Sequence, residues 1–397
     1  MKKDTLGIYI HIPFCVQKCA YCDFLSAPPE NEQAMHGYVR ALCREIILKS
    51  GYYDTRGSKA AIVDTVFFGG GTPSLLATED FNSILSTLRE HFIIAGDAEI
   101  TVECNPDTVD YIKLKNYMEQ GVNRISFGLQ SACNEELKML GRIHSYERFV
   151  KSFTDARKVG FTNINVDLIS AIPGQTPAGW TKTLRRVAGL EPEHISAYSL
   201  ILEEGTRLFE ERERYTFPTE DEDALMYEAT ESILGEYGYK RYEISNYAKN
   251  GFESRHNNRY WMRSEYLGFG VGAASFVDNM RFSNICDVGE YEKILTEYAD
   301  VKAANVETLI GERELLTPEE CMAEFFYLGL RRMEGVFFDD FGTEFGISPA
   351  DVYGKAMNKL VGQNLLEYIK EPDGRIKGIK LTREGIFLSN RVFMEFV

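Results

Sequence analysis

The sequence predicts an α/β protein: an incomplete (β/α)6 barrel followed by a small C-terminal α+β domain. Strand-like and helix-like runs alternate, and polar residues follow one strand after another. The residue pattern then changes after about Leu202 and again near Thr317. We therefore expect a barrel over residues 1–205, an extension over residues 206–310 that carries a His-Asn-Asn-Arg-Tyr-Trp run, and a winged-helix-like domain over residues 311–397.

The first half of the chain alternates between two periodicities. Runs rich in Val, Ile and Phe are typical of strands, and stretches with apolar residues every three or four positions are typical of helices. Strands are predicted at residues 8–12, 65–68, 99–103, 124–127, 163–168 and 194–199, and helices at residues 35–49, 79–91, 109–120, 146–159 and 180–190. Alternating strands and helices form parallel βαβ units with right-handed crossovers. From this pattern alone, a doubly wound open sheet remains the alternative.

The positions of polar residues favour the barrel. Cysteines follow the first predicted strand, a glycine run follows the second, Glu103 ends the third, Gln130 follows the fourth and Asp167 lies late in the fifth. In a barrel, all carboxyl ends of the strands meet at one mouth, whereas a doubly wound sheet concentrates its chemistry at one switch point. Polar residues spread over five successive strand ends therefore indicate a barrel.

The residues after the barrel predict mostly helices. Residues 203–213 are rich in both charges and predict an exposed turn or helix, and residues 222–237 predict a helix. Amphipathic helices at residues 318–333 and 348–365 precede a hairpin at residues 367–381 with a Pro-Asp-Gly turn. Helices followed by a two-stranded wing resemble a winged helix.

Composition limits the classes of partner. The chain has 397 residues, 44% of them hydrophobic, with 44 basic and 60 acidic side chains and a net charge of −16. An acidic chain lacks the basic face that nucleic acid requires, and no apolar stretch approaches the length of a membrane span. Residues 1–4 precede only a short apolar run, so we expect no signal peptide. A cytoplasmic protein is expected, because thiols that bind a cluster need a reducing compartment. The cysteines without motif spacing are Cys43, Cys104, Cys133, Cys286 and Cys321.

Three cysteines form one compact motif. Cys15, Cys19 and Cys22 have the spacing C-x3-C-x2-C. Three thiolates can hold a [4Fe–4S] cube and leave one iron without a protein ligand, and an open metal position can bind a small molecule. A zinc knuckle is the alternative, but zinc usually takes a fourth Cys or His at a regular offset. His11 precedes the run and lies on a predicted strand.

The cysteine run and its surroundings resemble the radical S-adenosylmethionine (SAM) superfamily, in its coproporphyrinogen-oxidase-like branch. The flanking residues that make this match closer are Tyr9, His11, Pro13, Phe14 and Tyr21. The resemblance implies two cofactors, a [4Fe–4S] cluster and SAM. It also implies that a reduced cluster can cleave the carbon–sulfur bond of SAM, in which case an electron donor is a partner.

The same resemblance implies a SAM pocket. The Gly-Gly-Gly-Thr-Pro run at residues 69–73 matches the branch, although three glycines can also serve only as a tight turn. An arginine suits the carboxylate of SAM, and carboxylates with an amide suit its ammonium and hydroxyl groups. The residues that the resemblance assigns to SAM are Tyr9, Tyr21, Gly70, Gly71, Thr72, Glu103, Gln130, Arg142 and Asp167.

A second motif lies in the extension. The run from His256 to Trp261 resembles the H-N-x-x-Y-W segment of HemW-like haem chaperones. Imidazole can bind haem iron and aromatic neighbours can shield a porphyrin face, although a lone histidine is more often structural. His256 is therefore a candidate haem ligand. The glycines at residues 268–272 make a poor dinucleotide fingerprint, because no strand–helix context with a downstream acid is evident.

Two features separate the chaperone from its enzyme relatives. Phe24 stands where the oxygen-independent coproporphyrinogen III oxidase has a further cysteine, and only eight residues precede Tyr9, so we expect no counterpart of the oxidase's N-terminal arm. The sequence therefore favours a haem chaperone that passes haem to an acceptor protein and lacks oxidase activity. The alternatives are that oxidase, which converts two propionates to vinyl groups, and a related radical SAM methyltransferase.

Overall fold

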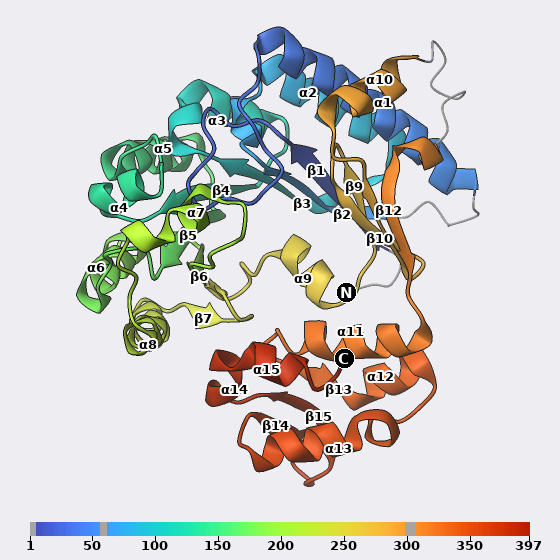
Figure 1. The fold of residues 1–397 in the computed structure, drawn as a ribbon. Helices are drawn as coiled ribbons and strands as arrows, with labels where there is room; N and C mark the ends of the chain where they lie inside the picture. The colour runs from blue at the N-terminus through green and yellow to red at the C-terminus, as the bar shows by residue number, and fades with distance from the viewer. Residues whose placement is uncertain (1–4, 56–61, 298–305) are drawn as a thin grey trace.

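The fold is described by a computed structural model that covers residues 5–55, 62–297 and 306–397 (Figure 1). Residues 1–4, which were considered above for a signal peptide, lie outside the described residues. Within the described part, twelve strands form one sheet in the order β12-β11-β10-β9-β1-β2-β3-β4-β5-β6-β8-β7, and three strands form a second sheet. The described residues include no helix that is both long and apolar enough to cross a bilayer.

The middle of the large sheet is the predicted parallel barrel. Its strands are β1 (Thr5–Ile12), β2 (Ile62–Gly70), β3 (Ile94–Cys104), β4 (Arg124–Gln130), β5 (Ile164–Ser170) and β6 (His194–Ser199). Each of these strands pairs in parallel with the next. The crossover helices are α1 (Glu32–Thr55), α2 (Thr78–His91), α3 (Tyr111–Glu119), α5 (Tyr146–Val159) and α6 (Pro177–Ala188). Because strand order follows sequence order without a reversal, the partial barrel is confirmed and the doubly wound alternative is excluded.

The extension continues the same sheet at both edges, which the sequence did not predict. β9 (Tyr266–Phe269) pairs in parallel with β1, and β10 (Ala274–Val277), β11 (Met280–Asn284) and β12 (Ile310–Leu315) follow in antiparallel order. At the other edge, β8 (Asn246–Ala248) pairs with β6 and β7 (Lys240–Arg241) pairs with β8, both antiparallel. The extension therefore shares the sheet of the barrel.

A buried ion pair in α1 fixes the edge of the sheet that begins with β9. Lys49 and Glu45 lie 2.7 Å apart with both side chains fully buried. Lys49 Nζ donates to the Gly268 carbonyl at 2.8 Å, and Glu45 accepts from the Gly270 N–H at 2.7 Å. Gly270 has φ +97°, a conformation that favours glycine. Gly268 and Gly270 of the glycine pattern at residues 268–272 thus serve packing against α1.

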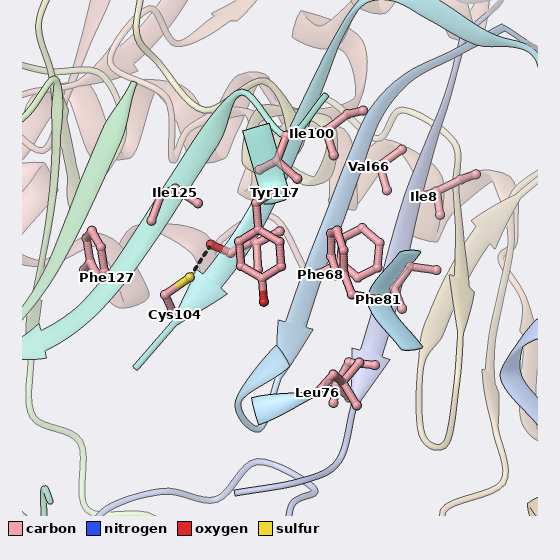
Figure 2. Packing of buried hydrophobic residues seen from close by; sticks show 14 of the residues in the cluster. Ile8, Val66, Phe68, Leu76, Phe81, Ile100, Cys104, Tyr117, Ile125 and Phe127 are labelled. Carbon is pink, nitrogen blue, oxygen red and sulfur yellow. Dashed lines mark hydrogen bonds between the residues drawn. The ribbon is translucent and has the colours of Figure 1, made fainter. Parts of the chain in front are cut away.

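The core between the sheet and its outer helices holds the strand ends in place (Figure 2). Phe68 of β2 packs against Phe81 of α2 with ring centroids 4.8 Å apart, and Phe81 packs against Tyr117 of α3 at 4.5 Å. Cys104 is buried in this cluster, and its sulfur faces the Val102 carbonyl. Cys104 is therefore a packing residue, as isolated cysteines often are.

The C-terminal domain has a core of its own. Its helices and strands are α11 (Pro318–Gly329), β13 (Val336–Phe337), α12 (Phe338–Phe345), α13 (Pro349–Gly362), β14 (Leu366–Lys370), β15 (Ile376–Leu381), α14 (Arg383–Phe387) and α15 (Ser389–Phe393). Phe326 stacks on Phe396 at 4.7 Å inside this core. The order of helices followed by an antiparallel hairpin confirms the predicted winged-helix-like arrangement.

Further α-helices of the described chain are α4, α7, α8, α9 and α10 (Val288–Glu297). The predicted helix at residues 222–237 is α8 (Glu220–Glu236), and the charged segment before it contains α7 (Arg207–Glu210). α4 (Asn134–Met139) was not predicted, because six residues are too short to show a helical period. α9 (Arg255–Trp261) is formed by the His-Asn-Asn-Arg-Tyr-Trp run.

Candidate functional site

A cavity of about 420 Å³ opens at the carboxyl ends of the barrel strands, within the size range of small-molecule sites. The structure brings together eleven of the predicted site residues here: Cys15, Cys19, Cys22, Tyr21, Gly70, Gly71, Thr72, Glu103, Gln130, Arg142 and Asp167 all line it. Among the described residues, Tyr9 and His256 are not part of its lining. The mouth of the barrel therefore gathers the motif residues, as the strand-end pattern predicted.

The three cysteines lie on one loop that is tied down at several points. The Cys15 N–H donates to the Ala27 carbonyl at 3.1 Å, and the Ala20 N–H donates to the Leu140 carbonyl at 2.9 Å. All three thiols are free and half-buried. Desolvation, with smaller contributions from Cys19 and Cys15, raises the pKa of the Cys22 thiol to about 11. Iron must therefore displace a proton when it binds, as is usual for thiolate sites.

The spread of these thiols disfavours a zinc site. No three His, Cys, Asp or Glu side chains of the described chain converge closely enough to hold a single metal ion. A zinc ion needs its ligands at about 2.0–2.3 Å from one centre, whereas a four-iron cube takes each thiolate on a different iron. The residues present fit the cube better than the single ion.

The glycine run forms the wall beside the cysteine loop. The Gly71 N–H donates to the Ile12 carbonyl at 2.8 Å, and the Thr72 N–H donates to the Phe14 carbonyl at 2.7 Å. A Cβ added at Gly71 would lie 2.7 Å from the Phe14 oxygen. Gly70 has φ +104°. These glycines are therefore required by close packing against the cysteine loop, and they also leave the cavity wall bare of side chains.

Arg142 presents an unused donor at the cavity. Its Nη2 donates to the Gly128 carbonyl at 2.6 Å and its Nη1 faces the Cys19 sulfur at 3.4 Å. Its buried Nε has no partner among the described residues. Desolvation opposes the charge, but Tyr21 and Cys19 raise the pKa of Arg142 above its usual value. A buried guanidinium with a free N–H fits a carboxylate ligand.

Two acidic groups of the cavity are Glu103 and Asp167. Desolvation and then the Asp167 carboxylate raise the pKa of Glu103 to about 8. Asp167 accepts hydrogen bonds from Asn165 Nδ2 at 2.8 Å and from Ser126 Oγ at 3.1 Å. Glu103 is therefore largely protonated at neutral pH unless a cation is beside it. A ligand with an ammonium group fits this pair.

Gln130 completes this wall in an uncommon backbone conformation. Its φ of +73° is rare for a residue other than glycine. Backbone strain of this kind often accompanies a functional site. Guanidinium, amide and carboxylate groups on one wall match the carboxylate, ammonium and hydroxyl groups of SAM, so the chain's own residues fit this cofactor.

Tyr9 has a different surrounding from the one predicted. Its hydroxyl bonds His11 Nδ1 at 3.1 Å, and its ring stacks on Phe67 with centroids 6.3 Å apart. His11 Nε2 lies 2.8 Å from the Leu25 carbonyl, which can only accept, so Nε2 carries the proton. Tyr9 therefore supports His11, which in turn bonds the backbone that follows the cysteines at Leu25. The sequence had placed His11 on a predicted strand before the cysteine run and included it in the resemblance.

The structure places His256 away from the cavity, with both ring nitrogens engaged. Nδ1 bonds Thr65 Oγ1 at 2.9 Å and Nε2 bonds the Tyr260 hydroxyl at 2.9 Å. The side chain is 1% exposed and stacks on Phe67 at 5.1 Å. Desolvation and then Arg259 lower the pKa of His256 to about 3. A haem iron would have to break one of these hydrogen bonds, so the geometry disfavours His256 as an axial ligand.

A chain of hydrogen bonds joins the cavity to the start of α9. The Asn165 amide that holds Asp167 also bonds His194 Nδ1 through its oxygen at 2.6 Å. His194 Nε2 bonds the Tyr242 hydroxyl at 2.8 Å, and that hydroxyl accepts from the Ser254 N–H at 3.2 Å. Ser254 caps the N-terminus of α9. Sequence reasoning missed this connection, because its members lie on four distant segments.

The comparisons agree with the architecture. The family model of the Radical SAM superfamily matches residues 9–187, and the family model of the HemN C-terminal domain matches residues 316–388. The heme chaperone HemW of Lactococcus lactis is 35% identical over 100% of this chain and 98% of its own length. The heme chaperone HemW of Bacillus subtilis is 34% identical over 98% of both chains. Coproporphyrinogen III oxidase (HemN) from Escherichia coli, a radical SAM enzyme, has a similar fold, with a TM-score of 0.84 and 24% identity over 99% of this chain and 90% of that chain.

Proposed function

The chain belongs to the HemW haem chaperones of the radical SAM superfamily, and we propose that it binds haem and transfers it to an acceptor protein while a [4Fe–4S] cluster and SAM occupy the barrel cavity. The observation that carries this proposal is the match to a heme chaperone over the full length of both chains. The presence of Phe24, where the oxidase has a cysteine, also supports it.

The cavity residues have separate roles in this proposal. Cys15, Cys19 and Cys22 would hold three irons of the cluster, and the iron without a protein ligand would be open to SAM. Arg142 pairs with the SAM carboxylate, and Glu103 accepts from its ammonium. When bound and reduced, the cluster supplies one electron to SAM, and the chain's residues orient both groups and exclude water.

A second candidate is the oxygen-independent coproporphyrinogen III oxidase. The fold similarity to HemN over nearly the whole chain favours it. Both functions use the same cavity, so geometry alone does not separate them. The separation lies in what happens to a tetrapyrrole: a carrier releases it unchanged, and an oxidase removes two carboxyl groups.

One parallel experiment tests the two functions. The full chain, reconstituted anaerobically with iron and sulfide and loaded with SAM, is titrated with haem and assayed with coproporphyrinogen III. We expect stoichiometric haem binding, seen as a saturating Soret change, and no protoporphyrinogen IX. Multiple turnovers to protoporphyrinogen IX would overturn the chaperone and establish the oxidase.

The proposal also concerns location and partners. We propose that the protein acts in the cytoplasm, because a cluster held by thiolates and free cysteines persist in a reducing compartment. Its partners are haem and an acceptor protein, together with an electron donor if SAM is cleaved. A pull-down of haem-loaded protein with candidate apo-haemoproteins, followed by haem transfer measured optically, tests the acceptor.

A further inference from the structure

Large apolar side chains are exposed around the mouth of the cavity. We call Val16, Phe24, Ile143, Tyr198 and Ile201 the apolar collar, because all five line the cavity and are also exposed. Phe24 is 61% exposed and Ile201 is 69% exposed. Apolar side chains that gather at one opening mark a binding surface, whereas single exposed ones need no explanation.

The apolar collar is held in place by its backbone. Its residues come from the cysteine loop, the segment after α4 and the end of β6. The Leu208 N–H donates to the Ala20 carbonyl at 2.8 Å, which ties α7 to the cysteine loop, and the two run side by side in Figure 1. The Leu200 N–H donates to the Ser170 carbonyl at 3.0 Å. A preorganised surface of this kind loses little entropy when a rigid ligand binds.

The rim of the mouth carries charges of both signs. Lys18 is exposed on the cysteine loop, and Arg207 Nη2 lies 3.4 Å from where a Cβ on Gly141 would be. Asp23 and Glu203 also line the mouth. A ligand with two carboxylates would turn them toward Lys18 and Arg207 and away from the two acids.

We propose that the apolar collar is the docking site of the haem that the protein carries. This inference rests on the proposed function. The macrocycle lies with one face on Phe24 and Ile201 and covers the mouth, and its propionates point toward Lys18 and Arg207. Under the same proposal the cluster and SAM fill the interior, which leaves the mouth open to a third ligand. The occupant is flat, apolar and dianionic, which matches the collar and its two cations.

Docking on the apolar collar differs from ligation by His256 in one measurable way. Stacking and propionate pairing do not need the iron, whereas axial ligation does. We therefore expect iron-free protoporphyrin IX to bind within a few-fold of haem. Protoporphyrin IX dimethyl ester, which lacks both carboxylates, should bind more weakly than either.

The test uses the full chain loaded with cluster and SAM. Haem and protoporphyrin IX are titrated against the wild type, the double variant Phe24→Ser/Ile201→Ser, and the control Ile112→Ser, whose side chain is 77% exposed on α3. We expect the double variant to bind both ligands at least about ten-fold more weakly, because the ring face loses its apolar partners. The control should match the wild type. Iron content and SAM affinity, measured on the same samples, should stay unchanged.

The possible outcomes separate this inference from the proposed function. If the wild type binds no haem, the proposed function fails. If the wild type binds haem and the double variant binds it equally well, only the docking site is wrong. Equal haem affinity with loss of transfer to an acceptor would make the apolar collar a protein-docking surface and would also overturn the inference. If the double variant loses iron, the single variant Ile201→Ser is used instead, because it leaves the cysteine loop intact. Haem affinity equal to that of the wild type in Ile201→Ser would then overturn the inference.

Discussion

The cavity wall and α9 each carry an arginine from a sequence motif, and the fold uses the two arginines in opposite ways. On the cavity wall, Arg142 has an Nε donor without a partner among the described residues. In α9, Arg259 donates to the Asp64 carboxylate at 3.0 and 2.5 Å and to the Glu265 carbonyl at 2.9 Å. A buried polar group without a partner is costly, so Arg142 has capacity for a ligand, whereas Arg259 is satisfied by the fold.

The same contrast holds for the other motif groups. Glu103 and Cys22 both line the cavity, and both have a raised pKa. A cation bound beside either group would favour its deprotonated form. At the start of α9, the backbone N–H groups of Arg255 and His256 donate to the Glu99 carboxylate of β3, at 3.1 and 3.0 Å. Membership of a motif therefore does not tell whether a residue binds a ligand or only packs in the fold. The hydrogen-bond partners of its polar groups distinguish the two roles.

The largest expected effect is on the cavity side. Cys15→Ala, Cys19→Ala or Cys22→Ala should each abolish the cubane, because Cys104, the other described cysteine that lines the cavity, is buried at the end of β3 with its sulfur facing the Val102 carbonyl. Reconstituted wild type should hold about four irons per chain, and each variant should lack the cubane absorption band. Cys286→Ala, at an exposed site, is the matched control. Loss of the band in that control would refute the ligand assignment.

The next effect should appear on the α9 side as lost stability. Arg259 is fully buried and Asp64 nearly so, and Arg259→Leu leaves the Asp64 carboxylate with only the partly exposed Arg255, 3.8 Å away. Breaking such a pair costs about 3–5 kcal/mol. Urea unfolding of the cluster-free chain measures it. Arg142→Leu should lower the free energy of unfolding by clearly less, because the cluster-free chain lacks the ligand with which Arg142 would pair. Equal losses in the two variants would contradict the comparison.

The converse experiment measures ligand affinity. Arg142→Ala should weaken SAM binding by about 1.5–3 kcal/mol, because it removes a charge-assisted hydrogen bond. Asp167→Ala should also weaken it. Calorimetry on cluster-loaded protein gives the affinities, and Arg259→Leu, where it folds, should retain the wild-type value. Unchanged affinity in both cavity variants would reject the pocket.

A fourth effect depends on pH. The pKa of Glu103 is about 8 without a ligand, so an ammonium must displace its proton when it binds below that pH. SAM affinity should therefore rise with pH up to about 8, by at most about ten-fold per pH unit. Glu103→Gln removes this contribution and leaves only the titration of SAM itself. Identical pH profiles for wild type and Glu103→Gln would show that Glu103 does not face the ammonium.

The barrel and most of the cavity could be predicted from the sequence because their signals are local. The cysteine spacing lies within eight residues, and Glu103, Gln130 and Asp167 each lie at or near the end of a recognisable strand. The sheet edges could not be predicted. β7 to β10 have two to four residues each, which is too short for a periodic signal, and β9 pairs with a strand from the other end of the chain.

The placement of His256 and Tyr9 could not be predicted for a different reason. A motif gives residue types but not the direction in which a side chain points. His256 is enclosed by Thr65 and Phe67 of β2 and by Tyr260 one helical turn away. Those partners become visible only when α9 and β2 are placed side by side, because 191 positions separate His256 from Thr65.

The smallest expected effect tests the hydrogen-bond chain that joins the two regions. Burial holds the pKa of His194 well below its usual value, so the ring is neutral, and the Asn165 oxygen requires the proton on Nδ1. His194→Phe removes this support from Asn165, which then holds Asp167 less firmly. SAM affinity should fall by about two- to five-fold, the worth of one hydrogen bond. A purely structural role would lower stability without depending on Asp167. In the Asp167→Asn background, the effect of His194→Phe on SAM affinity should therefore vanish, and an equal loss in both backgrounds would disprove the connection.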